Sequence, residues 1–165
     1  MRLLARIFPH PYLSLLLVLT WCFLQNSFSI NTLVMAIILA VIIPFTTARY
    51  WPDRPKLKRP FLIAEYVLIV IWDIIVANVV VAGLILFRRN DSLSPNWVAI
   101  PLDLRTPEAI TVLAGTITLT PGTVSSDLSS GGHVLLVHCL NAKDTSAVRD
   151  EIKSRYERRL KEIFE

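Results

Sequence analysis

Residues 12–46 form one uninterrupted stretch without a charged side chain. A helix that crosses a bilayer needs about 20 mainly apolar residues, so this stretch is long for a single crossing. Its only polar break is Gln25-Asn26-Ser27, near the middle. We therefore predict two membrane helices, near 8–25 and 30–47, joined by a tight turn.

A cleaved signal peptide is the alternative explanation of the first apolar run. Its hydrophobic region would be Leu13–Phe23, and small residues should follow at a cleavage site. The segment Gln25-Asn26-Ser27-Phe28 is a poor site of this kind. We therefore favour a helix that is retained in the protein.

A third apolar run covers residues 61–87, with Lys58-Arg59-Pro60 before it and Arg88-Arg89 after it. It is long enough for one crossing with tilt. Only 18% of the whole chain is charged, against about 25% in typical soluble domains. The N-terminal part, residues 1–89, is therefore predicted to be a transmembrane region of about three helices.

The net charge of +4 lies entirely in this apolar part of the chain. Residues 1–87 contain seven Lys and Arg against three acids, whereas residues 88–165 contain ten of each. Basic residues beside apolar runs are typical of membrane proteins. A nucleic-acid-binding protein would carry its positive charge on the polar domain, so no nucleic-acid partner is expected.

The remainder, residues 97–165, follows a linker at 90–96 and is predicted to be a small soluble α+β domain. Its elements alternate in the order β-α-β-β-α, with helices on one face of a sheet. The nearly continuous apolar run Val134–Val137 places the last strand at the centre of that sheet. The expected elements are a strand at 97–102, a helix from 106 to a stop at 120–122, strands at 123–128 and 133–140 around a turn, and a final helix from 144 or 145.

The final helix has apolar residues at every fourth position, namely Val148, Ile152, Tyr156 and Leu160. We expect its many charged residues to form a solvated face. That face would be supported by two ion pairs four residues apart, Glu151 with Arg155 and Glu157 with Lys161.

Glu65 and Asp73 are the only ionisable residues inside the third apolar run. A charge at the centre of a bilayer costs about 2.5–3.5 kcal/mol on insertion scales, so Asp73 should be paired, protonated or in contact with water. It is either a polar anchor for assembly with a neighbouring subunit or a relay for protons or cations. We favour assembly, because one helix alone cannot enclose an ion path. Asn78 lies about 140° from Asp73 around a straight helix, so the two do not share a site.

No combination of residues predicts catalysis, a cofactor or a metal site. Thr120-Pro121-Gly122-Thr123 is a turn, in which we expect Gly122 to have a positive φ or to permit a close backbone approach. A phosphate-binding loop would be longer and contain a lysine. His138 is isolated in an apolar strand and is expected to be structural. A triad of Ser125, Asp127 and His138 is rejected, because Ser125 lacks the context of a nucleophile.

Several segments together resemble one known family. The most distinctive is Ile117-Thr118-Leu119-Thr120-Pro121-Gly122-Thr123-Val124-Ser125-Ser126-Asp127, followed by Leu136-Val137-His138-Cys139-Leu140. Three others are Phe23-Leu24-Gln25-Asn26-Ser27-Phe28, Trp72-Asp73-Ile74-Ile75-Val76-Ala77-Asn78 and Val98-Ala99-Ile100-Pro101-Leu102. In this order they resemble the E-type subunit of the bacterial Mrp/Mnh/Pha-type multisubunit monovalent cation/proton antiporters, over almost the whole chain.

The resemblance implies an accessory subunit in the bacterial cytoplasmic membrane. The complexes of this family exchange Na+ or another monovalent cation for H+, with the ion path in two large subunits. The E-type subunit would contact the other subunits and the lipid bilayer, would support assembly and activity, and would need no cofactor. Members of the family can carry Glu at the position of Asp73, so a carboxylate is kept there.

Two other functions remain as alternatives. A self-sufficient small ion transporter would need more polar groups in the apolar helices than Glu65, Asp73 and Asn78. A membrane-anchored binding or enzyme module would need a recognisable motif in the polar domain. Both are less consistent with the sequence than an accessory subunit.

The sidedness of the C-terminal domain is the point on which two arguments disagree. Three crossings put the basic loop at 49–59 and the domain on opposite sides of the membrane. The positive-inside rule then places the loop in the cytoplasm and the domain outside. The resemblance implies a cytoplasmic domain, and we favour that placement.

Overall fold

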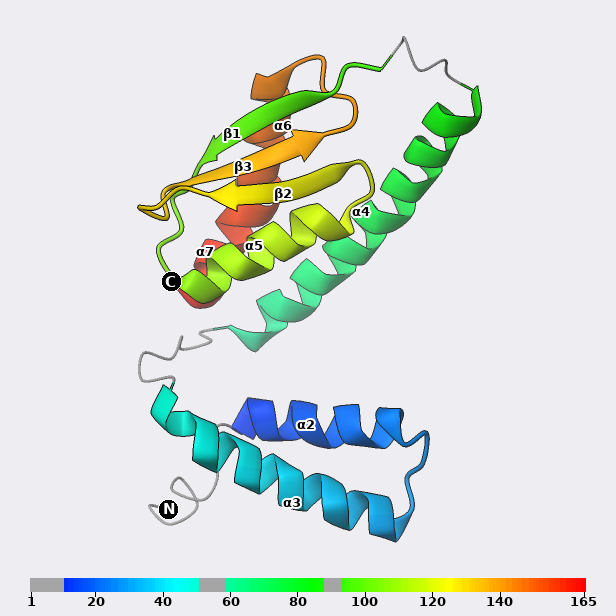
Figure 1. Cartoon of the computed structure of the whole chain (residues 1–165), viewed down its shortest axis with the longest axis vertical. Coiled ribbons are helices and arrows are strands. Elements are labelled where there is room, and N and C mark those ends of the chain that lie inside the picture. The colour runs from blue at the N-terminus through cyan, green and yellow to red at the C-terminus, as the bar shows by residue number, and fades with distance from the viewer. Residues whose placement is uncertain (1–10, 51–58, 88–92) are drawn as a thin grey trace. The chain divides into compact units, whose positions relative to one another are not determined.

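The computed structural model describes residues 11–50, 59–87 and 93–165. The chain divides into two compact units, residues 1–54 and 55–165 (Figure 1). The predicted helix start at 8–10, the basic pair Arg88-Arg89 and the beginning of the predicted linker at 90–92 lie outside the described residues.

The first unit is the predicted helical hairpin. It consists of α2 (Pro11–Leu24) and α3 (Ile30–Thr47), followed by a 3-10 turn at Ala48–Tyr50. The connection turns sharply at Asn26, which has a φ of 45°, and Asn tolerates this left-handed region better than most residues. Ser29 caps α3, because its side chain accepts a hydrogen bond from the backbone N–H of Thr32.

One hydrogen bond joins α2 to α3, and it satisfies a backbone carbonyl that a proline leaves without a donor. Pro44 lies inside α3 and has no N–H, so it cannot donate to the carbonyl of Ala40, four residues earlier. The hydroxyl of Ser14 in α2 donates to that carbonyl at 2.7 Å. The exposed fractions of Ser14 and Ala40 are only 6% and 2%, so the carbonyl would otherwise be buried without a partner.

Replacing Ser14 by Ala should therefore destabilise the hairpin by about 1–3 kcal/mol, the cost of a buried polar group without a partner. The variant Pro44→Ala restores the backbone donor to Ala40, so Ser14→Ala should cost much less in that background. Thermal unfolding of the four detergent-purified proteins of this double-mutant cycle measures the difference. Equal losses in both backgrounds would show that the hydroxyl has another role.

The second unit begins with the long helix α4 (Pro60–Phe87) and continues into a three-stranded antiparallel sheet. The strands are β1 (Asn96–Pro101), β2 (Thr123–Leu128) and β3 (Val134–Cys139), in the order β1-β3-β2. The prediction that β3 is central is confirmed. The predicted order β-α-β-β-α is also confirmed, and the first strand begins one residue earlier than expected.

Two helices cover one face of this sheet. The first is α5 (Pro107–Leu119), and the second is a continuous final helix made of α6 (Thr145–Ile152), a π-helical turn (Lys153–Glu157) and α7 (Arg158–Phe164). The core between sheet and helices consists of alternate strand residues and one face of each helix. Its most buried members include Val98, Ile100, Leu113, Ile117, Val137, Leu160 and Ile163.

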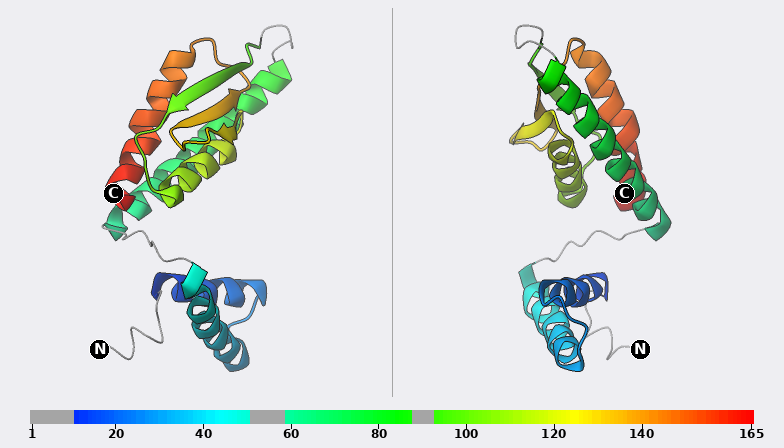
Figure 2. Two further views of the ribbon diagram at one scale, coloured as in Figure 1. Left: turned by 60° about the vertical axis from the view of Figure 1, so that its left-hand side comes forward. Right: turned by 90° about the vertical axis from the view of Figure 1, so that its right-hand side faces the viewer.

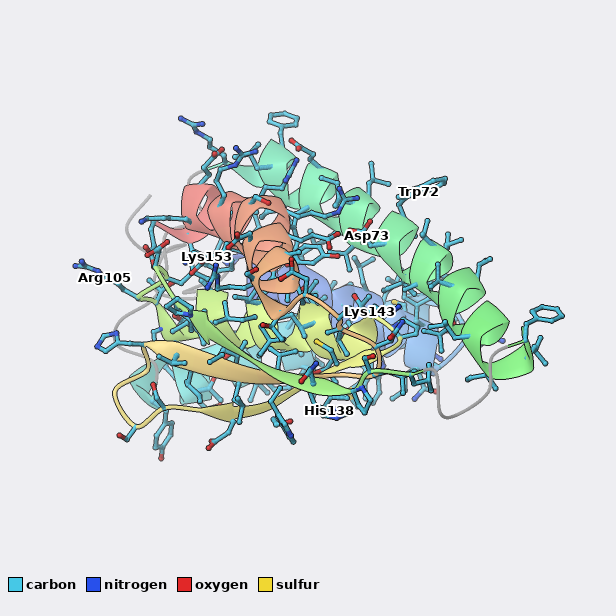
Figure 3. All side chains as sticks on the ribbon, turned by 90° about the horizontal axis from the view of Figure 1, so that it is seen from above. Trp72, Asp73, Arg105, His138, Lys143 and Lys153 are labelled. Carbon is cyan, nitrogen blue, oxygen red and sulfur yellow. The ribbon has the colours of Figure 1, made fainter. Side chains whose placement is uncertain are left out.

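Helix α4 runs beside α5 and the final helix, on the side of the sheet that these helices cover (Figures 2 and 3). Leu62, Tyr66, Ile69 and Val70 of α4 belong to or pack against the core cluster of the domain. The division between the two units therefore falls before α4, and not in the linker after it.

Two of the described helices are long and apolar enough to cross a membrane, Ile30–Thr47 and Phe61–Phe87. Helix α2 is apolar but shorter in the part that the structure describes. The chain thus contains the apolar N-terminal helices and the small α+β region that the sequence predicts.

Candidate functional site

Asp73 of α4 is bound by two residues of the final helix. Its Oδ1 accepts a hydrogen bond from Arg155 Nη2 at 2.6 Å, and its Oδ2 accepts from Arg155 Nε at 2.7 Å. The hydroxyl of Tyr156 donates to the same Oδ2 at 2.8 Å. The Asp73 side chain is 14% exposed. Figure 3 shows it on the side of α4 that faces the final helix, whereas Trp72 points away.

This arrangement is a bidentate Arg–carboxylate pair with a third donor, which is a strong and directional type of contact. The hydrogen bonds to Asp73 raise the pKa of the Arg155 guanidinium further above its already high usual value. Burial, and then the hydrogen bond to Asp73, raise the pKa of the Tyr156 hydroxyl above its usual value. Arg155 therefore stays charged and Tyr156 stays neutral across the physiological pH range.

A second pair lies alongside, between Glu65 and Arg159. Arg159 Nε lies 3.3 Å from Glu65 Oε1, and the Glu65 side chain is 52% exposed. Arg159 also donates to the carbonyl of Arg155 at 2.7 Å. An exposed pair of this kind contributes about 0–1 kcal/mol, so Asp73 is the main polar contact of α4.

Tyr66 connects α4 to α5 and was not singled out by the sequence analysis. It is 5% exposed, and its hydroxyl lies 2.8 Å from the Thr116 hydroxyl. Its ring meets the Tyr156 ring edge-on, with centroids 6.4 Å apart. Tyr66 precedes Asp73 by seven residues, which is two helical turns. That spacing was the available signal that both side chains share one face.

The prediction of a solvated charged face on the final helix is wrong for Arg155 and Arg159, which face α4. The predicted i,i+4 pairs are also replaced by other contacts. Arg155 binds Asp73, and Glu157 forms an ion pair with Lys153 at 2.8 Å. Glu157 is 3% exposed and accepts hydrogen bonds from the backbone N–H groups of Asp103 and Leu104. Glu157 therefore provides the hydrogen-bond acceptor for two backbone N–H groups of the loop after β1, a role that sequence spacing does not reveal.

Asn78 does not join this site. Its side-chain amide donates to the carbonyl of Ile74 in the same helix at 2.8 Å. The angular separation from Asp73 that the sequence predicted is therefore reflected in the structure. Of the three polar residues singled out in the third apolar run, the structure brings Glu65 and Asp73 to the final helix.

The Thr120-Pro121-Gly122-Thr123 turn lies against the C-terminal part of α4. The N–H of Thr123 donates to the carbonyl of Thr120 at 3.2 Å, which closes the turn. Gly122 has a φ of +92°, as predicted. A Cβ atom at this position would lie 3.2 Å from Val81 Cγ2 of α4. A pocket of about 250 Å³ lies between this turn, α4 and the final helix. The turn is therefore a contact with α4.

Asp127 and His138 are separate from the Asp73 contact and from each other. Asp127 is exposed and accepts a hydrogen bond from the N–H of Leu128 at 2.8 Å. The His138 ring packs against Trp97 with centroids 4.8 Å apart. Ser125 instead donates to the carbonyl of Ala114 in α5, so no triad forms. Within the described residues, no group of His, Cys, Asp and Glu is arranged to hold a metal ion.

Comparison with known proteins assigns nearly the whole chain to one family. The family described as MNHE, a Na+/H+ ion antiporter subunit, matches residues 14–163. The chain belongs to this family. The MNHE match includes α4, the turn at 120–123 and the final helix, and so covers every contact described above.

Individual relatives match this chain over nearly their full lengths. The probable K(+)/H(+) antiporter E-type subunit of Rhizobium meliloti (strain 1021) is 32% identical, over 96% of this chain and 98% of the relative. The Na(+)/H(+) antiporter E-type subunit of Alkalihalophilus pseudofirmus is 25% identical, over 92% of this chain and 95% of the relative. A chain in the archaeal membrane-bound sulfane sulfur reductase, a respiratory membrane complex, has a TM-score of 0.74 at 26% identity, over 93% of this chain and 97% of that one.

We call the contact of Asp73 with Arg155 and Tyr156 the Asp73 clamp. A double-mutant cycle on Asp73 and Arg155 tests how strongly this clamp holds α4 to the final helix. Asp73→Leu leaves the Arg155 guanidinium without its partner. Because the Arg155 side chain is 40% exposed, we expect a loss in stability of about 1–3 kcal/mol, less than for a fully buried pair. Adding Arg155→Leu should recover part of this loss. The matched control is Glu65→Leu with Arg159→Leu, where the coupling should be about 0–1 kcal/mol. Chemical unfolding of the purified subunit gives both values, and equal coupling in the two cycles would contradict the assignment.

Gly122→Val should destabilise the contact between the turn and α4. The positive φ costs about 1–3 kcal/mol for a residue with a side chain, and the new atoms meet Val81. Gly115→Ala is the control, because nothing lies within 4 Å of its added Cβ and Ala is favoured in a helix. Thermal unfolding of both variants measures the effect. A Val81→Ala background should remove the steric part of the loss and leave the backbone part.

Proposed function

We propose that this chain, a membrane subunit of a multisubunit monovalent cation/H+ antiporter, is an accessory subunit needed for assembly and activity. Its α4 and its α+β domain form one block that other subunits recognise, and the ion path lies in those other subunits. The observation that carries this proposal is the Asp73 clamp. The partly buried carboxylate of α4 has its charge balanced by Arg155 and is held by Tyr156.

A carboxylate in this state is poorly suited to carry protons. Relay through Asp73 would require repeated protonation beside a permanent positive charge, which favours the ionised form. The cation is open between the two ions that the names of its relatives contain, K(+) and Na(+). We further propose that the subunit lies in the bacterial cytoplasmic membrane with its C-terminal domain on the cytoplasmic side, as the family resemblance implies.

The test uses the complete set of subunits with Asp73→Asn in this chain. The amide keeps the shape and part of the hydrogen bonding but cannot titrate, so assembly and cation/H+ exchange should stay close to those of the wild type. Asp73→Leu should instead reduce the recovery of partner subunits with a tagged copy. Asn78→Leu is the control, because Asn78 bonds only within its own helix in the described contacts.

Exchange is measured with a pH-sensitive dye in inverted membrane vesicles, and recovery by affinity purification in detergent. A fully assembled Asp73→Asn complex without exchange would contradict the accessory role and place α4 in the proton path. Exchange by vesicles that contain this subunit alone would contradict it as well, and would favour a self-sufficient transporter.

A further inference from the structure

Helix α4 has two faces of different character. The positions that contact the domain include Leu62, Tyr66, Ile69 and Asp73, and Leu84 lines the pocket between α4, the final helix and the turn at 120–123. At about 100° per residue these positions share one side of the helix. They extend over 23 residues, or about 33 Å of helix, which is comparable to the thickness of the hydrocarbon core of a bilayer. The domain therefore lies along almost the whole length of α4.

This contact limits how α4 can meet the membrane. Lipid-exposed loops and open sheet edges do not occur in the hydrocarbon region, because their backbone groups would have no hydrogen-bond partners. The domain has two open edges, at β1 and β2, and charged side chains along the final helix. While α4 and the domain stay together, α4 cannot cross the bilayer with the domain beside it.

The side of α4 away from the domain is apolar, and we call the row of exposed residues along it the outer stripe. Further exposed apolar residues, among them Val67, Ile71 and Ile85, lie beside this row. The members of the row lie within about 60° of one another and roughly 125° from the centre of the covered face. Their exposed fractions range from 53% to 89%. The members of the outer stripe are Phe61, Leu68, Trp72, Ile75, Val79 and Leu86.

Basic residues stand on both sides of this helix in the sequence, at Lys58-Arg59 and at Arg88-Arg89. An apolar face with basic flanks is suited to the boundary between acyl chains and anionic headgroups.

We propose that α4 lies in the plane of the membrane surface, with the outer stripe in an anionic lipid bilayer and the domain on its aqueous side. Only the hairpin of α2 and α3 then crosses the membrane. The loop at 49–59 and the domain lie on the same side, so the positive-inside rule and a cytoplasmic domain no longer disagree. The chain then has the three apolar helices that the sequence predicts, but only two of them cross the membrane.

Cysteine labelling of the assembled complex tests the number of crossings. The variants are Gln25→Cys in the hairpin turn, Arg59→Cys before α4 and Ser130→Cys in the turn between β2 and β3, all at exposed positions. The native Cys22 and Cys139 are 1% and 3% exposed, and the unsubstituted chain gives the background. A membrane-impermeant maleimide is applied to sealed spheroplasts and to inverted vesicles.

Arg59→Cys and Ser130→Cys should react only in inverted vesicles, and Gln25→Cys only in spheroplasts. Reaction of Arg59→Cys and Ser130→Cys from opposite sides would overturn the in-plane placement of α4. Reaction of both from outside alone would overturn the cytoplasmic placement proposed above and leave the in-plane placement standing. The two proposals therefore fail separately.

Spin labels at Phe61, Leu68, Ile75 and Leu86 identify what covers the outer stripe. The complex is reconstituted in vesicles of phosphatidylcholine and phosphatidylglycerol, with a label at the exposed Lys143 as the aqueous control. An in-plane helix predicts relaxation by oxygen at a similar shallow depth for all four positions. A depth maximum at Ile75 with shallow ends would indicate a crossing helix. Protection of all four positions from oxygen would show that a partner subunit, and not lipid, covers this face. Either result would overturn the proposal.

Discussion

The arrangement of the second unit depends on one charged contact, the binding of Asp73 by Arg155 and Tyr156. Most of the α4 surface is aliphatic, and aliphatic surfaces pack in many rotations with similar free energy. The Asp73 carboxylate needs a guanidinium and a hydroxyl at defined distances, and only one rotation of α4 about its axis provides both. The clamp thereby selects which side of α4 meets the domain, and the apolar contacts along the helix follow from that choice. We regard this selection of one docked state as its main contribution, since replacing a whole ion pair by apolar side chains of similar volume often leaves stability unchanged.

Much of this fold follows from local sequence patterns. The hairpin, the order of strands and helices, the central position of β3 and the positive φ of Gly122 all depend on residues close in sequence, where periodicity and turn chemistry are informative. The partners of Asp73 are 82 and 83 residues away, and no local pattern connects them. The basic residues of the final helix are matched by acids of the same helix, so the sequence alone assigns Arg155 and Arg159 to solvent.

The final helix illustrates a subtler limit. Its apolar residues recur every four positions, and each such step rotates a side chain by about 40° around an α-helix. Over Val148, Ile152, Tyr156 and Leu160 the rotation would move the last residue well away from the first. The π-helical turn at Lys153–Glu157 has more residues per turn and reverses part of that rotation. The same turn contains Arg155 and Tyr156, so the irregularity that keeps the core face continuous also presents the clamp to α4.

The bond between Ser14 and Ala40 has a consequence for the two helices of the hairpin. Both are apolar and smooth, so most of their side chains would tolerate sliding by one residue or one turn. The carbonyl freed by Pro44 is different, since the other inner carbonyls of α3 are engaged along its own axis. A slipped pairing would present the hydroxyl to an acceptor already in use and leave the vacant one in an apolar surrounding. The missing N–H of Pro44 thus fixes the register in which α2 and α3 pack, because only one alignment brings the Ser14 hydroxyl to the free carbonyl.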